Sequence, residues 1–505
     1  MSPFRRGANY DPLTPLSQRS FYRPNLINQT PTSRRSVFFV AAFVIVVLFV
    51  AMLLYGSNLR SAAASVKNDQ DSESELVVVQ HPTALDEAKR KVDQKYCGMD
   101  KCRFLVPVVI IEQETKSQMH FRHLSFLSNR LNRTIVLPNV GSAFLGLCRP
   151  HTFTYYFSIS WLDVRQEAGQ IRYILREDYE AWLSERAEIT TAEQDMRPAA
   201  VDINVLWNAS MINSGVKEQN CWAERLTYEG WGKERKAVVV ADGKLKNENP
   251  TEMLREGIVR AVKNGKGEEP EVVNVWYDRR TPFIDDAAAQ QPLSYAKHWT
   301  TQASALTDPL APLIAVHWRM EGIQPVAKLA ACARNLTEHI RRIAQREPHT
   351  VYFLTDYPHL LNLTGEDVDS IGTNPESETF NAETLTSEHH EAVAVLYGTY
   401  NISMSYLSTP ETESFLEMLR EQIPSSVRLL PVRPPPATGG PDHSTLGIVD
   451  KVVAMQARWF LAGRGWECAR YSSYTQQIVR ERRRKWEVQG LADVEGGIAN
   501  VVEYW

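Results

Sequence analysis

One uninterrupted apolar run, from Val37 to Tyr55, places the strongest constraint on what this chain can be. As a helix, a run of this length spans about 28 Å, close to the ~30 Å hydrocarbon core of a bilayer. Arginines such as Arg34 and Arg35 precede it, whereas acidic residues such as Asp69 and Asp71 follow it. The positive-inside bias therefore predicts a cytosolic tail (1–36), a transmembrane helix (37–55), and a remainder on the far side of the membrane. The alternative is a cleaved signal peptide, but the run exceeds an h-region and no small-residue cleavage site follows it.

Cysteines and glycosylation sequons agree with this orientation. All six cysteines follow the apolar run, in what would be an oxidising compartment; their pairing stays open, since six cysteines allow about 15 connectivities. An N-x-S/T sequon begins at each of Asn132, Asn208, Asn335, Asn362 and Asn401. Asn28 also begins one, but on the predicted cytosolic side, where we expect it to stay unmodified.

Charge and composition divide the rest of the chain. The formal net charge is −4, and Lys and Arg are dispersed, which argues against a nucleic-acid partner. Residues 56–95 are polar and short of large apolar side chains, as expected of a solvated stem. The remaining head is long enough for two domains, which we place at 96–305 and 306–505.

The head shows alternating strand and helix signals. Phe104 to Ile111 is an apolar, β-branched run of strand length, and a helical pattern through Phe121 and Leu124 leads to a second strand, Thr134 to Leu137. Further short apolar runs occupy Ala237 to Ala241, Val272 to Trp276, Leu313 to Val316 and Val351 to Leu354. Continuous apolarity is typical of strands buried on both faces, so we predict an α/β fold with parallel sheets. Pro431 to Pro441 is predicted to be a loop.

Three segments place polar residues where such strands end, at the edge where α/β sheets bind ligands. In the first, a buried strand delivers His317, Arg319 and Glu321 at alternating positions. Arg319 there could bind a phosphate through two parallel hydrogen bonds. The alternative is a surface ion pair between Arg319 and Glu321, with His317 as a core residue.

The second segment is Ser472-Ser473-Tyr474-Thr475, which follows a strand and begins a helix. Hydroxyls and free backbone N–H groups at a helix start are suited to binding phosphate. The alternative is that Ser472 or Ser473 only caps the helix.

The third segment carries Glu112 and Glu114, between the first strand and the first helix of the head. A carboxylate there can serve as a general base if it faces a cleft between two domains. The alternative is an acidic first turn stabilised by the helix dipole.

Taken in order, these segments resemble the GDP-fucose protein O-fucosyltransferase family over most of the head. Leu131 to Pro138 (LNRTIVLP) is similar to the family's LNRTLVLP strand entry, and His317-x-Arg319-x-Glu321 is similar to its HxRxE or HxRxG box. VYFLTD, ending at Asp356, is similar to its VYVATD strand, and SSYT before a basic helix is similar to its SSFT. The box, with Glu321 and no following Asp-Trp, is closer to the plant and fungal branches. The resemblance implies a GT-B fold, two Rossmann-like domains facing a cleft, in a type II membrane protein of the Golgi or endoplasmic reticulum.

The resemblance also implies site residues. Arg319 matches the family arginine that binds the donor's diphosphate and stabilises the departing phosphate, His317 matches its partner, and Asp356 matches an acid near the nucleotide. Ser472, Ser473, Tyr474 and Thr475 match the turn around the phosphates. Glu114, with Glu112 in reserve, matches the position of the catalytic base in some members. The family's glycines in that first loop are replaced here by Glu-Gln-Glu-Thr-Lys.

The implied reaction is a single inverting displacement that moves fucose from GDP-fucose to a hydroxyl of a protein or glycan, with no metal required. No Asp-x-Asp occurs at a strand end in the C-terminal half. Alternatives are a transferase that uses another GDP-sugar, a relative that binds glycans or protein without turnover, and a membrane-anchored adhesion protein.

Overall fold

The computed structural model describes residues 83–205, 228, 238–239, 252, 256–260, 269–278, 286–346, 349–357, 380, 384–421, 423–436, 439–470, 472–489 and 497–505. The predicted tail, the run Val37 to Tyr55, most of the predicted stem, and the residues Asn208, Cys221 and Asn362 lie outside them. Within the described ranges, no helix combines the length and the apolar character needed to cross a membrane. Residues 82–505 form one compact unit.

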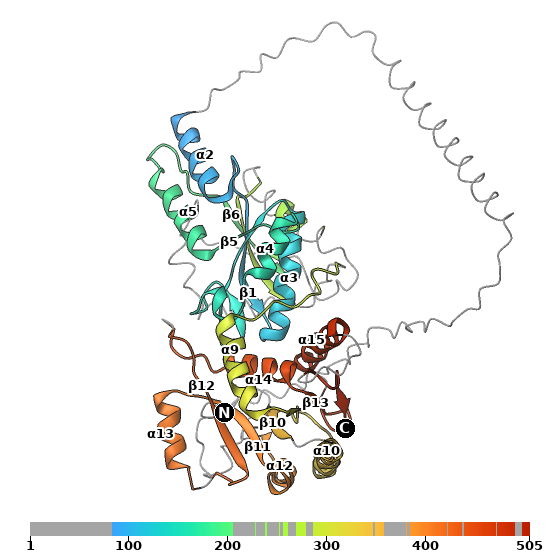
Figure 1. The fold of residues 1–505 in the computed structure, drawn as a ribbon. Coiled ribbons are helices and arrows are strands. Elements are labelled where there is room, and N and C mark those ends of the chain that lie inside the picture. Colours follow the sequence, from blue (N-terminus) through green and yellow to red (C-terminus); the bar gives the residue numbers. More distant parts are fainter. Residues whose placement is uncertain are drawn as a thin grey trace, which may run out of the picture. The chain divides into compact units, whose positions relative to one another are not determined.

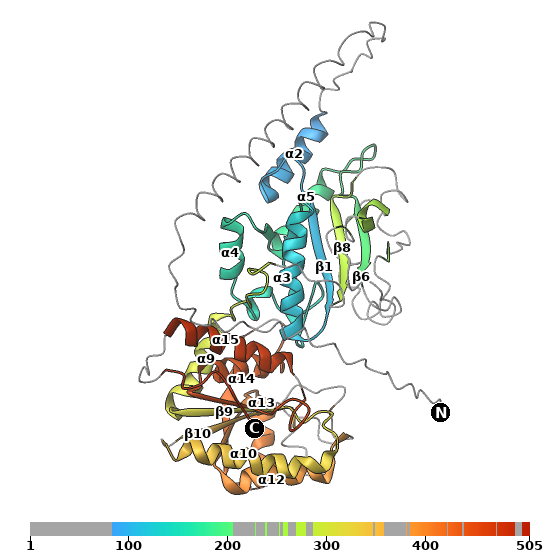
Figure 2. The same ribbon diagram turned by 90° about the vertical axis from the view of Figure 1, so that its right-hand side faces the viewer.

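The first sheet of this unit is mostly parallel and is built around β1 (Phe104–Ile111), which matches the predicted strand. On one side of β1 the order continues through β2 (Thr134–Val136) to β5 (Tyr173–Ile174). On the other side it continues through β8 (Val272–Asp278) and β6 (Ala200–Val205) to β7 (Val238–Val239). An antiparallel hairpin, β3 (Asn139–Gly141) and β4 (Phe144–Gly146), joins the end of β1. Figure 2 shows β1, β8 and β6 running side by side.

The two faces of the first sheet are covered by different helices because successive strand residues point to opposite sides. Leu105 packs in one core cluster with Phe121 and Leu124 of α3 (Glu114–Arg130). Phe104 packs in another with Trp182 of α5 (Arg176–Glu188). The shorter helix α4 (Ser160–Glu167) joins the α3 side through buried Leu162. Both faces are therefore buried, as the continuous apolar run of β1 predicts.

The second sheet is parallel throughout, in the order β12-β11-β10-β9-β13-β14. Its strands are β9 (Leu313–Trp318), β10 (Thr350–Thr355), β11 (Ile402–Leu407), β12 (Val427–Val432), β13 (Trp459–Ala462) and β14 (Glu503–Tyr504). Its helices are α9 (Lys297–Thr307), α10 (Leu329–Ala344), α12 (Ser387–Thr399), α13 (Pro410–Met418), α14 (Thr445–Gln456) and α15 (Ser473–Gln489).

Alternating residues of β9 divide between the two faces of this sheet. Ile314 and Val316 pack with residues of α10 and α12, whereas Ala315 packs with residues of α14. Figure 2 shows α10 and α12 on one side of the strands and α14 on the other. His317 therefore points to the α14 side, where α15 also begins.

Each sheet has a position where the chain order reverses. From β9 the chain moves outward through β10, β11 and β12, while β13 and β14 lie on the other side of β9. In the first sheet the reversal falls between β1 and β8. Open α/β sheets bind ligands beyond the carboxyl ends of the strands at such a switch point. The fold therefore indicates two places for chemistry, after β9 and after β1.

The described halves share one hydrophobic core. A single cluster contains Leu105 and Phe121 of the first half together with Val449 and Phe460 of the second. Helix α9, which we assigned to the domain ending at 305, packs against α14 of the second half, and Gln456 donates to Ser304 there at 3.3 Å. The boundary between the halves thus falls before α9.

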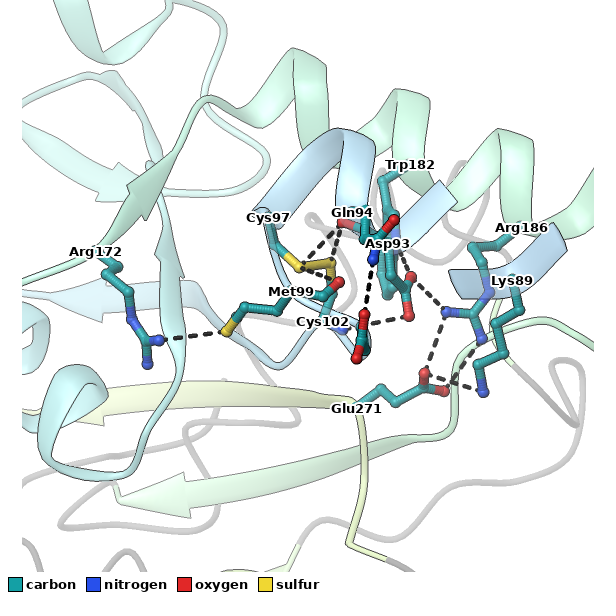
Figure 3. The surroundings of a disulfide bond; sticks show 11 residues. Lys89, Asp93, Gln94, Cys97, Met99, Cys102, Arg172, Trp182, Arg186 and Glu271 are labelled. Atoms are coloured by element: carbon teal, nitrogen blue, oxygen red, sulfur yellow. Dashed lines mark hydrogen bonds and ion pairs between the residues drawn. A yellow bond between two sulfur atoms is a disulfide. The ribbon is translucent and has the colours of Figure 1, made fainter. Parts of the chain in front are cut away.

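The stem prediction ends too late in the sequence. Residues 84–97 form helix α2 (Ala84–Cys97), which packs against α5, although 56–95 were expected to be solvated (Figure 1). Asp93 is fully buried and accepts hydrogen bonds from Trp182 (2.7 Å) and Arg186 (2.9 Å), as Figure 3 shows. A disulfide between Cys97 and Cys102 connects the end of α2 to the residues just before β1. Helix α2 is therefore part of the head.

Pro431 also differs from expectation, because it lies within β12 rather than in the predicted loop. β12 is an edge strand, and a proline that cannot donate a ladder hydrogen bond is tolerated there. The rest of the proline-rich segment that the structure describes is irregular.

Candidate functional site

The carboxyl end of β9 holds His317 against the start of α15. Nδ1 of His317 and Oγ1 of Thr475 are hydrogen-bonded at 2.9 Å, and the imidazole stacks on the ring of Tyr474 with centroids 5.1 Å apart. Burial, reinforced by the charges of Arg319 and Lys451, lowers the pKa of His317 to about 3. The imidazole is therefore neutral at physiological pH and serves as a hydrogen-bonding group.

Arg319 lies just beyond β9 and pairs with Glu321. Its Nε donates to Oε2 of Glu321 at 3.2 Å, and its Nη2 contacts the same oxygen. The side chain of Arg319 is 31% exposed, whereas that of Glu321 is only 7% exposed. The ion pair that we weighed as an alternative is thus present, but it is anchored on a buried carboxylate and leaves the guanidinium open to solvent on one side.

Asp356 shapes the turn that carries Arg319. It follows β10, the neighbour of β9, and its carboxylate accepts backbone N–H groups of Met320 at 2.7 Å and Glu321 at 2.9 Å. Burial raises the pKa of Asp356 to about 6, while these hydrogen bonds oppose the rise. In this structure Asp356 positions the backbone next to Arg319, and its place near the nucleotide stays a prediction.

The hydroxyl-rich segment begins α15, as predicted. Ser472 precedes the helix, and its Oγ accepts the backbone N–H of Thr475 at a long 3.5 Å, so Ser472 caps the helix, while its part in phosphate binding stays a prediction. Tyr474 donates from its hydroxyl to the carbonyl of Gly447 in α14 at 2.8 Å. Ser473 and Thr475 lie in the first turn of the helix, and Thr475 contacts His317. The structure thus brings His317 together with Tyr474 and Thr475.

Glu114 is the first residue of α3, so it lies beyond β1 at the other switch point. Its carboxylate pairs with Lys451 of α14, accepts from the hydroxyl of Tyr295 at 2.9 Å, and accepts from Nε2 of Gln118 at 2.7 Å. Glu114 is 8% exposed and Lys451 is fully buried. Nζ of Lys451 also donates to Oε1 of Gln477 at 2.9 Å, which ties α3, α14 and α15 together.

Glu112 lies between β1 and α3 in a strained backbone conformation. Its φ is 140°, in a region that residues with a Cβ rarely adopt, and such strain gathers at functional sites. Its carboxylate pairs with Lys116 at 3.0 Å and its side chain is 20% exposed. Of the two carboxylates predicted as the base, Glu112 is therefore the more open to solvent and Glu114 the more tightly held.

Lys451 connects Glu114 with the group formed by His317, Tyr474 and Thr475, and it was not among the predicted site residues. Its ammonium contacts Glu114 and also lies 4.8 Å from the ring centroid of Tyr474, which stacks on His317. A signal existed in the sequence, because Asp450 and Lys451 interrupt an otherwise apolar helical run. Ionisable residues in such a run are expected to have specific partners.

The remaining predicted site residues are sequon asparagines. Asn132, Asn335 and Asn401 are exposed, whereas Asn208 and Asn362 lie outside the described residues. In the part of the chain that is described, no group of three or more His, Cys, Asp or Glu side chains is placed to hold a metal ion. That the reaction requires no metal stays a prediction.

No family model and no curated protein matches the chain. Solved structures that are similar include POFUT1 in complex with GDP-fucose, at 11% identity and a TM-score of 0.39, over 80% of this chain and 97% of that one. POFUT1 in complex with GDP is similar at 11% identity and a TM-score of 0.37, over 76% of this chain and 94% of that one. Fucosyltransferase NodZ from Bradyrhizobium is similar at 10% identity and a TM-score of 0.32, over 75% and 92% of the two chains. Values this low transfer no residue role to this chain.

Proposed function

We propose that this chain is a glycosyltransferase that moves a sugar, fucose in the first instance, from a GDP-sugar to a hydroxyl of a protein or glycan. One observation carries the proposal. Lys451 contacts both Glu114, beyond β1, and the ring of Tyr474, which stacks on His317 at the end of β9. One carboxylate suited to proton transfer, Glu114, and the groups suited to phosphate are thus linked through a single side chain.

The donor side would bind the diphosphate. The guanidinium of Arg319 matches phosphate geometry, and the first turn of α15 presents backbone N–H groups, the hydroxyls of Ser473 and Thr475, and the positive end of the helix dipole. His317, neutral and hydrogen-bonded to Thr475, would keep that turn in place. The choice of guanine and fucose follows from the sequence resemblance alone.

The acceptor side would remove a proton. In a single inverting displacement, the acceptor oxygen bonds to the anomeric carbon as the bond from that carbon to the β-phosphate oxygen breaks. The acceptor's proton passes to a carboxylate, Glu114 or Glu112, and the charge on the leaving GDP is stabilised by Arg319 and the start of α15. Preorganised charge of this kind is commonly the largest part of catalysis.

We also propose a single-pass type II topology with the head in the lumen of the Golgi or endoplasmic reticulum. The run Val37 to Tyr55 and its flanking charges support this orientation. The disulfides Cys97–Cys102 and Cys332–Cys468 suit an oxidising compartment.

A thermal-shift series with GDP, GDP-fucose, GDP-mannose and UDP-sugars tests the proposal. A ligand that binds only the folded state stabilises it by about 2.7 kcal/mol at 100 times its Kd. We expect stabilisation by GDP and GDP-fucose but not by UDP-sugars, and release of GDP in the presence of an acceptor. A larger response to GDP-mannose would favour another donor, and binding without turnover would favour the non-catalytic relative. No response to any nucleotide would overturn the proposal and favour an adhesion protein.

A further inference from the structure

A second arginine shares the carboxylate that holds Arg319. Arg470 lies in the loop between β13 and α15, so it reaches the same switch point from the other side of β9. Its Nη1 pairs with Oε1 of Glu321 at 3.0 Å, while Arg319 pairs with Oε2 of the same carboxylate. Two guanidinium groups are therefore held side by side by one buried anion.

The backbone fixes Arg470 in this position. Its N–H donates to the carbonyl of Arg319 at 3.1 Å. Its side chain passes over Gly322, and a Cβ added to that glycine would lie 3.4 Å from Nη1 of Arg470. The φ of Gly322 is 69°, which also favours glycine at this position. The side chain of Arg470 thus lies along the turn that follows Arg319.

The loop between β13 and α15 is held in place by a disulfide and a hydrogen bond close to Arg470. Cys468 forms a disulfide with Cys332 at the start of α10, and its carbonyl accepts Nε1 of Trp318 at 2.6 Å. A side chain that is already ordered loses less conformational entropy when it binds a ligand. The loop therefore presents Arg470 as a preformed group.

Exposure indicates that both arginines can reach a ligand. The side chain of Arg470 is 38% exposed and that of Arg319 is 31% exposed, above a carboxylate that is 7% exposed. A guanidinium has five N–H donors, so a contact with Glu321 leaves capacity for a further anion. Glu321 keeps two like charges together that would otherwise repel each other.

We infer that Arg470 is a second diphosphate-binding residue, which grips the nucleoside diphosphate of the donor together with Arg319. The inference rests on the proposed function, since it takes the donor to be a nucleotide sugar. Arg470 belongs to none of the motifs that carry the family resemblance. Its role is to bind the donor, with Glu321 as the residue that positions both arginines.

The test compares two arginines of one loop. Arg470→Met removes the proposed contact, and Arg464→Met is the matched control, because Arg464 is 59% exposed and pairs with Glu467 at 3.7 Å. GDP affinity is measured by calorimetry on the whole head, and melting without ligand checks the fold. A lost charged hydrogen bond should raise the Kd for GDP roughly 10- to 100-fold in Arg470→Met. Arg464→Met should bind GDP like the wild type.

A third variant and a second ligand keep the test decisive. Arg470→Lys should be intermediate, because it keeps the charge but lacks the planar fork. GMP lacks the β-phosphate, so Arg470→Met should weaken GDP binding more than GMP binding. Unchanged GDP affinity in Arg470→Met, or an equal loss in Arg464→Met, would overturn the inference while the proposed function stands. A wild type that does not bind GDP would instead overturn the proposed function.

Discussion

The carboxylate of Glu114 and the ammonium of Lys451 form an ion pair between the first turn of α3 and the middle of α14, 337 residues apart in the chain. Burial lowers the pKa of Lys451, and Glu114 opposes that shift. The pair therefore holds the Glu114 carboxylate firmly, and Glu112 is the more exposed of the two candidates.

Replacing Lys451 tests this pair. Lys451→Met would leave a buried carboxylate without its cation, at a cost of roughly 3–5 kcal/mol in the free energy of unfolding at pH 7. The unpaired carboxylate is more easily buried when protonated, so the stability that the variant loses relative to the wild type should shrink as the pH is lowered from 7 to 5. Urea unfolding at several pH values measures this.

Two further variants serve as controls for Lys451. Lys485→Met removes a half-buried lysine of α15 that donates to the Met455 carbonyl at 3.2 Å, and its stability relative to the wild type should not recover at low pH. Adding Glu114→Gln to Lys451→Met should restore much of the lost stability. A double variant as unstable as Lys451→Met alone would contradict a direct coupling.

Arg319→Lys keeps the positive charge but loses the planar fork. If a bidentate contact with phosphate is lost in the transition state, GDP-sugar turnover should fall on the order of a hundredfold or more. Arg319→Ala should be worse, with melting unchanged in both. Arg341→Lys, on the exposed side of α10 and paired with Glu338 at 2.9 Å, is the control and should retain activity. Near-normal turnover in Arg319→Lys would contradict a role in phosphate binding and would mean that Arg319 only forms an ion pair with Glu321.

Glutamine substitutions separate the two candidate bases. Glu114→Gln or Glu112→Gln, whichever removes the base, should abolish transfer to the acceptor yet leave GDP binding intact, because neither changes the phosphate contacts. We place Glu114 first on its sequence offset and Glu112 second, with its strained backbone in its favour. Transfer assays and GDP titration on both variants decide between them. Wild-type transfer rates in both would show that neither carboxylate is the base.

The neutral state of His317 should make stability depend on pH. Its pKa is about 3 in the folded protein against an ordinary 6.5, so only the unfolded chain takes up this proton between those values. The contribution of His317 to stability should therefore fall as the pH drops below 6.5, by up to about 3 kcal/mol at pH 4. His317→Asn, which retains a polar group near Thr475, should flatten that part of the stability curve. If stability depends on pH with the same slope in the variant and the wild type, His317 is not the cause of that dependence.

Glycan mapping tests the topology. If the head is lumenal, the exposed asparagines Asn132, Asn335 and Asn401 should be available for glycosylation, together with Asn208 and Asn362, while Asn28 stays bare. Endoglycosidase shifts on single Asn→Gln variants provide the measurement. A glycan on Asn28 would show that the membrane orientation is the reverse of the predicted one. A mature N-terminus beyond Tyr55 would show that the segment is cleaved and is not an anchor.

Local patterns predicted several of the buried strands but missed β6 and β11. β1 matches its predicted bounds, and β9 and β10 each extend the predicted run by one or two residues, because a continuous apolar, β-branched run has few other ways to be buried. The predicted end of the stem was wrong because α2 is polar in sequence, although it packs on the head. Its Asp93 is buried against Trp182 and Arg186, and a sequence does not show that an aspartate has such partners.

The residues that follow the central strands could be identified from the sequence: His317 and Arg319 after one buried run, and Glu112 and Glu114 after another. Strand period and chain order fix those positions locally. Their partners are apparent only in the folded protein: Lys451 pairs with Glu114, Asp356 binds the backbone of the turn that carries Arg319, and Arg470 lies beside Arg319. Each of these contacts joins elements far apart in the chain, and it depends on which faces of α3, α14 and α15 meet when the two sheets bury their shared core.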